Sequence, residues 1–408
     1  MIPLTLTFDV PATILQGLAT GSLERVGGVI RDVSTKQVVM WLREFGTTGA
    51  VPGSSFVPSF DPITGAFNFV MQGVNAGISL KGFAAVNQQL DAIQGLLNIT
   101  SAASILNLGV SAIGFAVISK RLKELEQRLQ KAQEVLVKID KKIDLSFYAN
   151  FRAALDLATN AFTMSKGDNR RSSALNAINR FLEAQHIYAD YVDKEFEQKS
   201  QIGDEYLLTL CLAYIAEARC YLELEEFDTA ARRFQEGKAQ IRYRVEKYID
   251  LLLTSKPLIY LHPALKGKTS LSRLTGIYQW KDFNLDENSV FESLRDNIVP
   301  DSGSWDSHID KWIESLPASV IEKSKFKKGL FGFKHEERAE VIQKLPQIME
   351  EMESTLETNQ RFEAYELEVK AVSKLGMSFH EWLQLKPSES QPVGANLMYI
   401  IPAEPLDL

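Results

Sequence analysis

The histidines and acidic residues of this chain are the side chains most able to bind a metal ion. The five histidines are His186, His262, His308, His335 and His380. None belongs to an H-E-x-x-H motif, which places two imidazoles on one helix face for zinc. Asp306, His308 and Asp310 alternate, but the glycine and distal glutamate of a calcium loop are missing there. We therefore expect no metal site.

Nucleophiles and phosphate-binding turns are equally sparse. Cys211 and Cys220 lie nine residues apart in one helical stretch, too far along a helix axis for a disulfide, so we expect two buried free thiols. The sequence contains no G-x-S-x-G elbow and no P-loop. Gly27-Gly28 lacks the further glycines of a dinucleotide-binding turn, and we interpret this pair as a bulge in a strand. The sequence predicts no cofactor and no catalytic activity.

The composition bounds the class of protein. The 408 residues are 45% hydrophobic and 24% charged, which is typical of a folded globular protein. The net charge of -7, with acidic and basic residues mixed, argues against a nucleic-acid partner. The N-terminus "MIPLTLTFDVPATILQ" has an acidic Asp9 and no basic region, which is unlike a signal or transit peptide. We expect a cytoplasmic protein, with membrane association as an open alternative.

The N-terminal residues predict a small unit that contains strands. Apolar and polar residues alternate from Leu4 to Val10, the period of a half-buried strand. "ATILQGLAT" then suggests a short helix, and "RVGGVIRD" and "KQVVMWLREF" suggest two further strands. Residues 1–45 are therefore expected to form a β-rich unit of β-α-β-β order, and residues 46–64, rich in glycine, proline and serine, a linker.

The rest of the chain predicts a mainly α-helical fold, a helical bundle with long helices that resemble coiled coils. Residues 145–255 have helical periodicity, and residues 256–335 mix loops with short helices. Residues 336–376 predict one long helix that is kinked or begins at Pro346, and residues 377–408 predict an extended tail.

One stretch of the helical region resembles a single tetratricopeptide repeat, "AYIAEARCYLELEEFDTAARRFQEGKA". The matching positions are Tyr214, Ala218, Tyr221, Phe227, Ala230 and Phe234. Glu217 stands where the repeat has an apolar residue, and a stable array needs about three repeats. The resemblance implies a helical hairpin and says little about peptide binding.

Residues 65–144 are expected to be an apolar helical segment that runs into a coiled-coil helix. Apolar residues after Lys120 recur at spacings of three and four, as in a coiled-coil interface. The interface residues are Leu122, Leu125, Leu129, Leu136, Ile139 and Ile143. The same register continues back to Leu108, so we expect one helix over residues 101–143. Whether such interfaces pair within one chain or between chains stays open.

Residues 92–119 carry no charge and are long enough to cross a hydrocarbon core, although their hydropathy is borderline. The candidate membrane residues are Leu106, Gly109, Ala112, Ile113, Phe115, Ala116 and Val117. A second candidate for lipid contact is a loop in which lysines alternate with apolar residues: Lys325, Phe326, Lys327, Lys328, Phe331 and Phe333. The alternatives, which we favour, are the buried centre of a helical bundle for the apolar segment and a flexible, solvated loop for the lysine-rich one.

This apolar segment followed by amphipathic helices resembles the organisation of α-helical pore-forming toxins. The resemblance implies a hydrophobic segment that packs on a helical bundle and moves into a membrane on assembly. We therefore expect one of two functions. The first is a non-catalytic interaction or assembly protein, a homo-oligomer or the binder of a protein partner, acting through its coiled-coil helices. The second is a membrane-active effector that inserts residues 92–119 into lipid.

Overall fold

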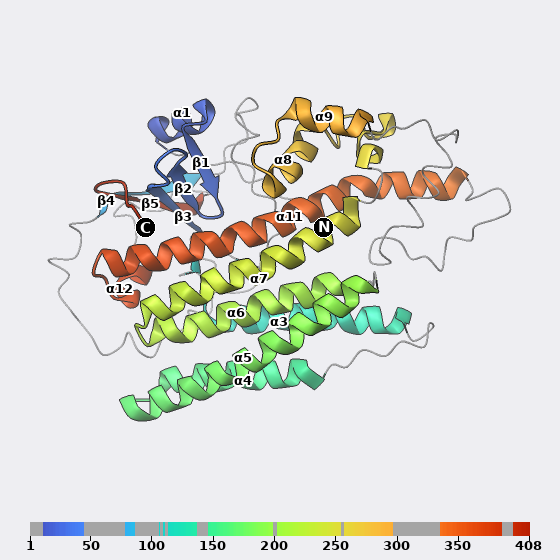
Figure 1. The fold of residues 1–408 in the computed structure, drawn as a ribbon. Coiled ribbons are helices and arrows are strands. Elements are labelled where there is room, and N and C mark those ends of the chain that lie inside the picture. Colours follow the sequence, from blue (N-terminus) through green and yellow to red (C-terminus); the bar gives the residue numbers. More distant parts are fainter. Residues whose placement is uncertain are drawn as a thin grey trace. The chain divides into compact units, whose positions relative to one another are not determined.

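A computed structural model describes ten stretches of the chain: residues 11–44, 78–85, 106, 109–110, 113–136, 146–198, 202–253, 257–296, 335–385 and 395–408. The fold is mainly helical with one small antiparallel sheet, as the sequence predicted (Figure 1). The chain divides into two compact units made of separate stretches. Among the described residues, the first unit comprises those within 189–207 and 241–356, and the second comprises those within 11–188, 208–240 and 357–408.

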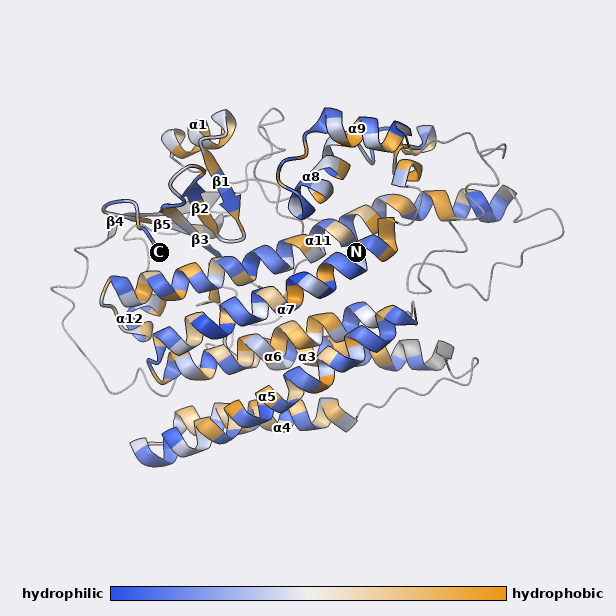
Figure 2. Ribbon diagram, viewed as in Figure 1, coloured by the Kyte–Doolittle hydropathy of each residue, from blue (hydrophilic) through white to orange (hydrophobic). Residues whose placement is uncertain are grey.

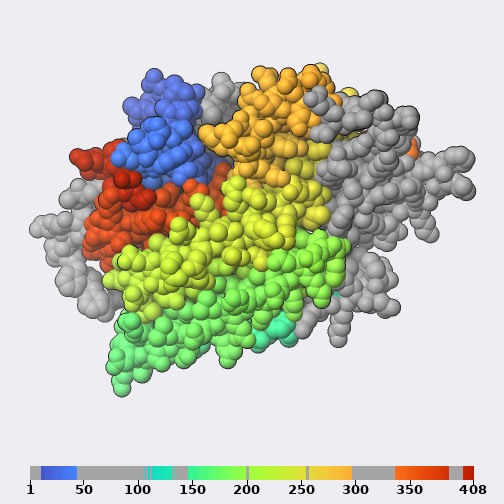
Figure 3. All heavy atoms as spheres, viewed as in Figure 1, coloured from blue at the N-terminus to red at the C-terminus, as the bar shows by residue number. Residues whose placement is uncertain are grey.

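The sheet belongs to the second unit and joins the two ends of the sequence. Its strands are β1 (Leu23–Val26), β2 (Val29–Asp32), β3 (Val38–Glu44), β4 (Ile78–Ala85) and β5 (Ala395–Pro402). Their order is β1-β2-β3-β5-β4, with every neighbouring pair antiparallel. Strand β5 therefore lies between β3 and β4. Figure 3 shows the N-terminal residues in blue directly against the C-terminal residues in red.

Residues 1–45 differ in detail from the β-α-β-β order that we predicted. Helix α1 (Ala12–Thr20) is present, whereas the predicted strand at residues 4–10 lies outside the described residues. Our interpretation of Gly27-Gly28 as a bulge was wrong, because these residues form the turn between β1 and β2. Gly27 has a φ of 55°, a conformation that suits glycine because it has no Cβ.

The helices of the central region follow the predicted pattern. They are α3 (Phe115–Leu136), α4 (Ser146–Thr163), α5 (Gly167–Glu197), α6 (Gly203–Glu223) and α7 (Phe227–Leu253). Figure 2 shows apolar and polar residues interleaved along these helices, which gives each of them an apolar face to bury. In the second unit, the rings of Phe151 and Phe181 pack edge to face at 5.7 Å between α4 and α5.

The predicted long C-terminal helix is confirmed as α11 (His335–Lys374). Pro346 lies inside this helix and does not begin it. Phe234 of α7 and Tyr365 of α11 pack with their ring centres 5.5 Å apart, in the second unit. Helices α5, α6, α7 and α11 each have residues in both units.

The first unit also contains the short elements expected between residues 256 and 335. They are η5 (Pro257–Leu261), η6 (Pro263–Leu265), α8 (Leu271–Lys281) and α9 (Glu287–Asp296). Arg273 of α8 binds Glu353 of α11 through two hydrogen bonds of 2.7 Å. Arg242 of α7 donates to the Trp280 carbonyl oxygen at 3.0 Å and lies over the Trp280 ring.

The expected single helix over residues 101–143 is not present. Residues 106, 109–110 and 113–114 are outside any α-helix, and α3 begins only at Phe115. Residues 78–85, which we expected to be helical, form strand β4 because β5 supplies their hydrogen-bonding partner. The hydrophobic periodicity of residues 78–85 does not indicate that β5, from a distant part of the sequence, will pair with them.

The last residues do not form an extended tail. Helix α12 (Phe379–Gln384) begins with a capping box in which Ser378 and Glu381 bond each other's main chain. Strand β5 then enters the sheet, and Leu406 exchanges two main-chain hydrogen bonds with Val38. The apolar run of residues 397–401 is thus used to pair with two strands, which explains why the end of the chain is so apolar.

Candidate functional site

A row of arginine and glutamate side chains joins the sheet to α11 in the second unit. We define this arginine-glutamate strip by its members: Arg25, Arg31, Arg43, Glu357, Arg361, Glu363 and Glu368. Each of the three strands β1, β2 and β3 contributes one arginine, and α11 contributes the other residues. Glu357, Arg361 and Glu368 are spaced by four and seven residues, which places them on one helix face.

The first group of the strip is a buried pair of Arg25 with Glu357. Arg25 donates two hydrogen bonds to the Glu357 carboxylate, at 3.0 and 2.9 Å, and Arg361 adds a third at 3.2 Å. Burial alone would raise the pKa of Glu357. The charges and hydrogen bonds of Arg25 and Arg361 outweigh burial and lower this pKa to about 2. Glu357 is therefore a buried carboxylate that stays ionised because two cations hold it.

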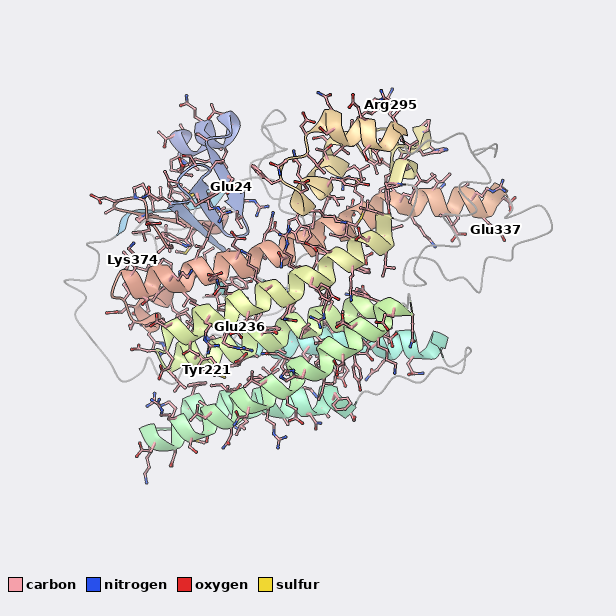
Figure 4. All side chains as sticks on the ribbon, in the orientation of Figure 1. Glu24, Tyr221, Glu236, Arg295, Glu337 and Lys374 are labelled. Atoms are coloured by element: carbon pink, nitrogen blue, oxygen red, sulfur yellow. The ribbon has the colours of Figure 1, made fainter. Side chains whose placement is uncertain are left out.

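A second, more exposed group links the sheet to α7. Arg31 binds Glu363 at 2.6 Å, and Lys238 of α7 binds the other oxygen of the same carboxylate at 2.7 Å. Although burial opposes ionisation, Lys238 and Arg31 keep the pKa of Glu363 below its usual value. Glu24, which Figure 4 labels on β1, accepts hydrogen bonds from Arg31 and Lys36. This group continues the strip to the protein surface.

Glu368 is the centre of the third group. One carboxylate oxygen accepts a hydrogen bond from Trp382 Nε1 at 2.7 Å and lies 3.6 Å from Arg43 Nη2. Arg43 also donates to the Trp382 carbonyl oxygen at 3.1 Å and lies over the Trp382 ring. The other oxygen of Glu368 accepts from the main-chain N–H of Val110 at 2.7 Å. Glu368 therefore connects α12, β3 and the residues that precede α3.

The strip holds part of the candidate membrane segment at two points. Arg361 donates to the Leu106 carbonyl oxygen, and Glu368 accepts from Val110 as described above. We call Leu106, Gly109, Val110 and Ile113 the docked stretch. All four are buried, with Leu106 and Val110 each 1% exposed and Ile113 2% exposed. Because these two main-chain groups bond to charged side chains, they do not bond within a helix, which explains why α3 starts after them.

The remaining candidate membrane residues lie at the start of α3. Phe115 and Val117 are partly buried, and Phe115 stacks on Phe162 of α4 with ring centres 5.7 Å apart. Ala116 is exposed, and Ala112 lies outside the described residues. Among the helices that the structure describes, none has the length and hydropathy that a membrane crossing requires.

The predicted coiled-coil residues of α3 are buried within a single chain. Leu122, Leu125 and Leu129 are fully inaccessible to solvent, and α3 packs on α4. The side chain of Leu136 is outside the described residues, as are Ile139 and Ile143. For the residues that can be placed, contacts within the chain therefore bury the predicted interface.

Helices α6 and α7 form the hairpin that the tetratricopeptide-like stretch implied, and the structure gives Glu217 a role. Glu217 is fully buried on α6, where its carboxylate lies 2.7 Å from Arg233 Nε and accepts from Gln185 at 2.6 Å. Burial raises the pKa of Glu217, while Gln185 and Arg233 oppose the rise. Figure 4 labels Tyr221 and Glu236 on the same hairpin. The likeness to the repeat family itself stays a prediction.

Several expected sites fall where the structure gives no description. The lysine-rich loop, with Lys325, Phe326, Lys327, Lys328, Phe331 and Phe333, lies outside the described residues, and so do Asp306, His308 and Asp310. In the part of the chain that is described, no group of three or more histidine, cysteine, aspartate or glutamate side chains could hold a metal ion. Cys211 and Cys220 are free and buried, as predicted.

The strip was missed in the sequence because its signals are weak. Arg25, Arg31 and Arg43 each stand beside an acidic residue in the sequence, as on an ordinary solvated strand, and Glu357 and Arg361 are an ordinary pair on a long helix. Nothing in these local patterns marks the charges as buried. The sequence could not have shown which charges meet, because Arg25 and Glu357 are 332 residues apart.

The chain matches no known protein family, and neither a curated protein nor a solved structure is significantly similar to it. Its function must therefore be argued from its own geometry. The strip has the features of a stabilising contact between the sheet and α11, because its carboxylates bind arginines, a lysine, a tryptophan and the main chain. No described part of it leaves a nucleophile beside a general base.

Proposed function

We propose that this protein is a non-catalytic interaction protein that associates with further copies of itself. The observation that carries the proposal is a set of large apolar side chains exposed to solvent. Among the described residues they are Leu175, Tyr243, Phe283 and Phe291, and the three aromatic ones belong to the first unit. Aromatic side chains are frequent anchors of protein interfaces because they bury a large area with little loss of side-chain freedom.

Phe283 and Phe291 are the best candidates for such anchors. Phe283 lies between α8 and α9 and is 76% exposed, and Phe291 on α9 is 48% exposed. The neighbouring Asp282 and Asn284 are also exposed, and Asp282 accepts two hydrogen bonds from Asn284. Polar residues beside an apolar anchor are the arrangement expected at the rim of an interface.

In this arrangement, the contact between two copies does not involve the predicted coiled-coil helices. Leu122, Leu125 and Leu129 are buried within one chain, so they cannot pair with another copy unless the chain opens. The exposed aromatics of α8 and α9 need no such opening. They offer apolar area that a second molecule can cover directly.

Light scattering over a range of protein concentrations tests this proposal. We expect the purified protein to form an oligomer, and a Phe283→Ser/Phe291→Ser double variant to dissociate at concentrations where the wild type does not. Leu175→Ser is the matched control, because Leu175 is 45% exposed on α5 in the other unit. A wild type that is monomeric throughout, or dissociation caused equally by Leu175→Ser, would refute the proposal.

A second candidate function is membrane insertion, which one specific observation favours. The four residues of the docked stretch are buried, none of them belongs to an α-helix or a strand, and Arg361 and Glu368 bind its main chain. Among the described residues, no α-helix or strand would have to come apart for these four to leave. This supports the idea of an effector that hides an apolar segment in its water-soluble form.

Dye release from anionic and neutral vesicles tests the second candidate. Ala116→Asp adds a charge to the apolar segment at a position that is exposed in the folded chain, so the fold should tolerate it. Gln127→Asp is the control, because Gln127 is also exposed on α3 but lies outside the segment. We expect release by the wild type and by Gln127→Asp, and its loss in Ala116→Asp. No release by the wild type would refute membrane insertion.

A further inference from the structure

The exposed aromatic side chains Phe283 and Phe291 lie on a surface that carries mainly one sign of charge. Between Lys281 and Arg295 the chain has four acidic residues and no basic one. All four acidic residues are exposed, as are the two phenylalanines. We define the acidic-aromatic patch by these six residues: Asp282, Phe283, Asp286, Glu287, Phe291 and Glu292. The patch therefore combines apolar anchors with a local excess of negative charge.

Helix α9 presents much of the patch from within the first unit. Val290 and Leu294 lie one turn apart on α9 and are only 2% and 3% exposed, which directs the other sides of the helix towards solvent. Asp286, just before α9, accepts two hydrogen bonds from Ser289, at 2.7 and 2.6 Å. The patch thus belongs to a folded part of the chain, so a partner need not order it on binding.

Basic neighbours do not neutralise the patch. Lys281 comes directly before it but binds Asp250 of α7. Arg295, which Figure 4 labels on α9, lies one turn beyond Phe291. Four acidic residues and this one arginine leave a net charge of -3 over residues 282–295. Among the described residues, none of the four carboxylates of the patch takes part in an ion pair.

These charges decide what kind of surface can cover the two phenylalanines. A second acidic-aromatic patch would bring like charges together, which opposes association. An uncharged surface would remove water from the carboxylates without replacing it by a partner, which costs free energy. A surface with lysine or arginine beside apolar side chains would bind both the aromatic and the acidic members of the patch.

We propose that a second copy of the chain covers the acidic-aromatic patch with a basic surface, and not with the same patch. This inference rests on the proposed self-association and adds the chemistry of the surface opposite Phe283 and Phe291. Two different surfaces of the chain then meet at each contact, in contrast to a patch that pairs with itself across a two-fold axis.

Neutralising the patch measures the sign of the charge on the partner surface. Glu287→Gln/Glu292→Gln removes two exposed carboxylates of α9 and leaves Asp286 to bind Ser289. The matched control is Asp190→Asn/Glu197→Gln, because both residues are exposed on α5 in the same unit and their replacement changes the net charge equally. Sedimentation equilibrium gives the association constants of the wild type and of both double variants.

We expect Glu287→Gln/Glu292→Gln to weaken association about fivefold, as for the loss of two exposed ion pairs. The whole chain has a net charge of -7, so removing two negative charges elsewhere should leave association unchanged or slightly tighter. The expected weakening is therefore opposite to the effect of net charge alone. Raising the sodium chloride concentration from about 0.05 M to about 0.5 M should reduce the difference between the wild type and this variant, because salt screens exposed charges.

Three results would overturn the inference. Tighter association of Glu287→Gln/Glu292→Gln would show that the patch faces a negative surface, such as a second copy of itself. Unchanged association would show that the partner surface contributes no charge there, and equal weakening in the control would show that the effect is not specific to the patch. In each case the Phe283→Ser/Phe291→Ser variant still tests self-association separately, whereas a monomeric wild type refutes both proposals.

Discussion

The close approach of the β1–β2 turn to α11 predicts an unusually costly glycine substitution. A Cβ added at Gly27 would lie 2.9 Å from both Arg361 Cα and Gln360 O, and 3.0 Å from Ala364 Cβ. Two of these atoms belong to the main chain of α11, so they cannot move aside as a flexible side chain would. Gly27→Ala should therefore cost about 1 to 3 kcal/mol of overpacking in addition to backbone strain.

The backbone strain can be measured separately at Gly21. Its φ of 75° is also left-handed, but no atom lies within 4 Å of an added Cβ. Gly21→Ala should cost only about 1 kcal/mol, whereas Gly27→Ala should cost about 2 to 4 kcal/mol. Urea unfolding followed by circular dichroism compares the two variants. Equal losses of stability would show that the turn does not press on α11 and would refute the packing described for the sheet.

Three further predictions concern single residues of the second unit. The pKa of Glu357 is lowered from 4.5 to about 2, so ionised Glu357 contributes about 3 kcal/mol to the free energy of unfolding above pH 4.5, and this contribution is lost as the pH falls towards 2. The free energy of unfolding should therefore depend less on pH in Glu357→Gln than in the wild type. The same pH dependence in both proteins would contradict the pairing. Burial raises the pKa of Cys211 and Cys220, so neither should be alkylated at pH 8 without urea, and rapid labelling would show that α6 is not buried. Ser378→Ala removes the α12 cap and should lower the free energy of unfolding by about 1 kcal/mol in urea titrations, whereas no change would show that the capping box does not stabilise α12.

Local patterns in the sequence were sufficient for most of the helices. The three- and four-residue spacing of Leu122, Leu125 and Leu129 identified a buried face of α3, and the predicted end of the long helix at residue 376 is close to Lys374, where α11 ends. These signals succeed because a helix satisfies its hydrogen bonds locally and needs a partner only for its apolar face.

The sheet and the arginine-glutamate strip could not be predicted in the same way. Strand β5 pairs residues from opposite ends of the sequence, such as Arg43 and Met398, and nothing in either strand specifies the other. The start of α3 was missed because Arg361 and Glu368 bind the main chain just before it. In each case a contact from a distant part of the chain overrides a local preference, which is the usual reason that such predictions fail.

The position of β5 has a consequence for synthesis of the chain. Residues 395–402 leave the ribosome after the other four strands, yet they form the strand between β3 and β4. Until they emerge, β3 and β4 have no described strand to join them, and each presents an unpaired edge that invites association with other chains. The sheet can therefore close only once these residues are free of the ribosome, and nascent chains should depend on chaperones until that moment.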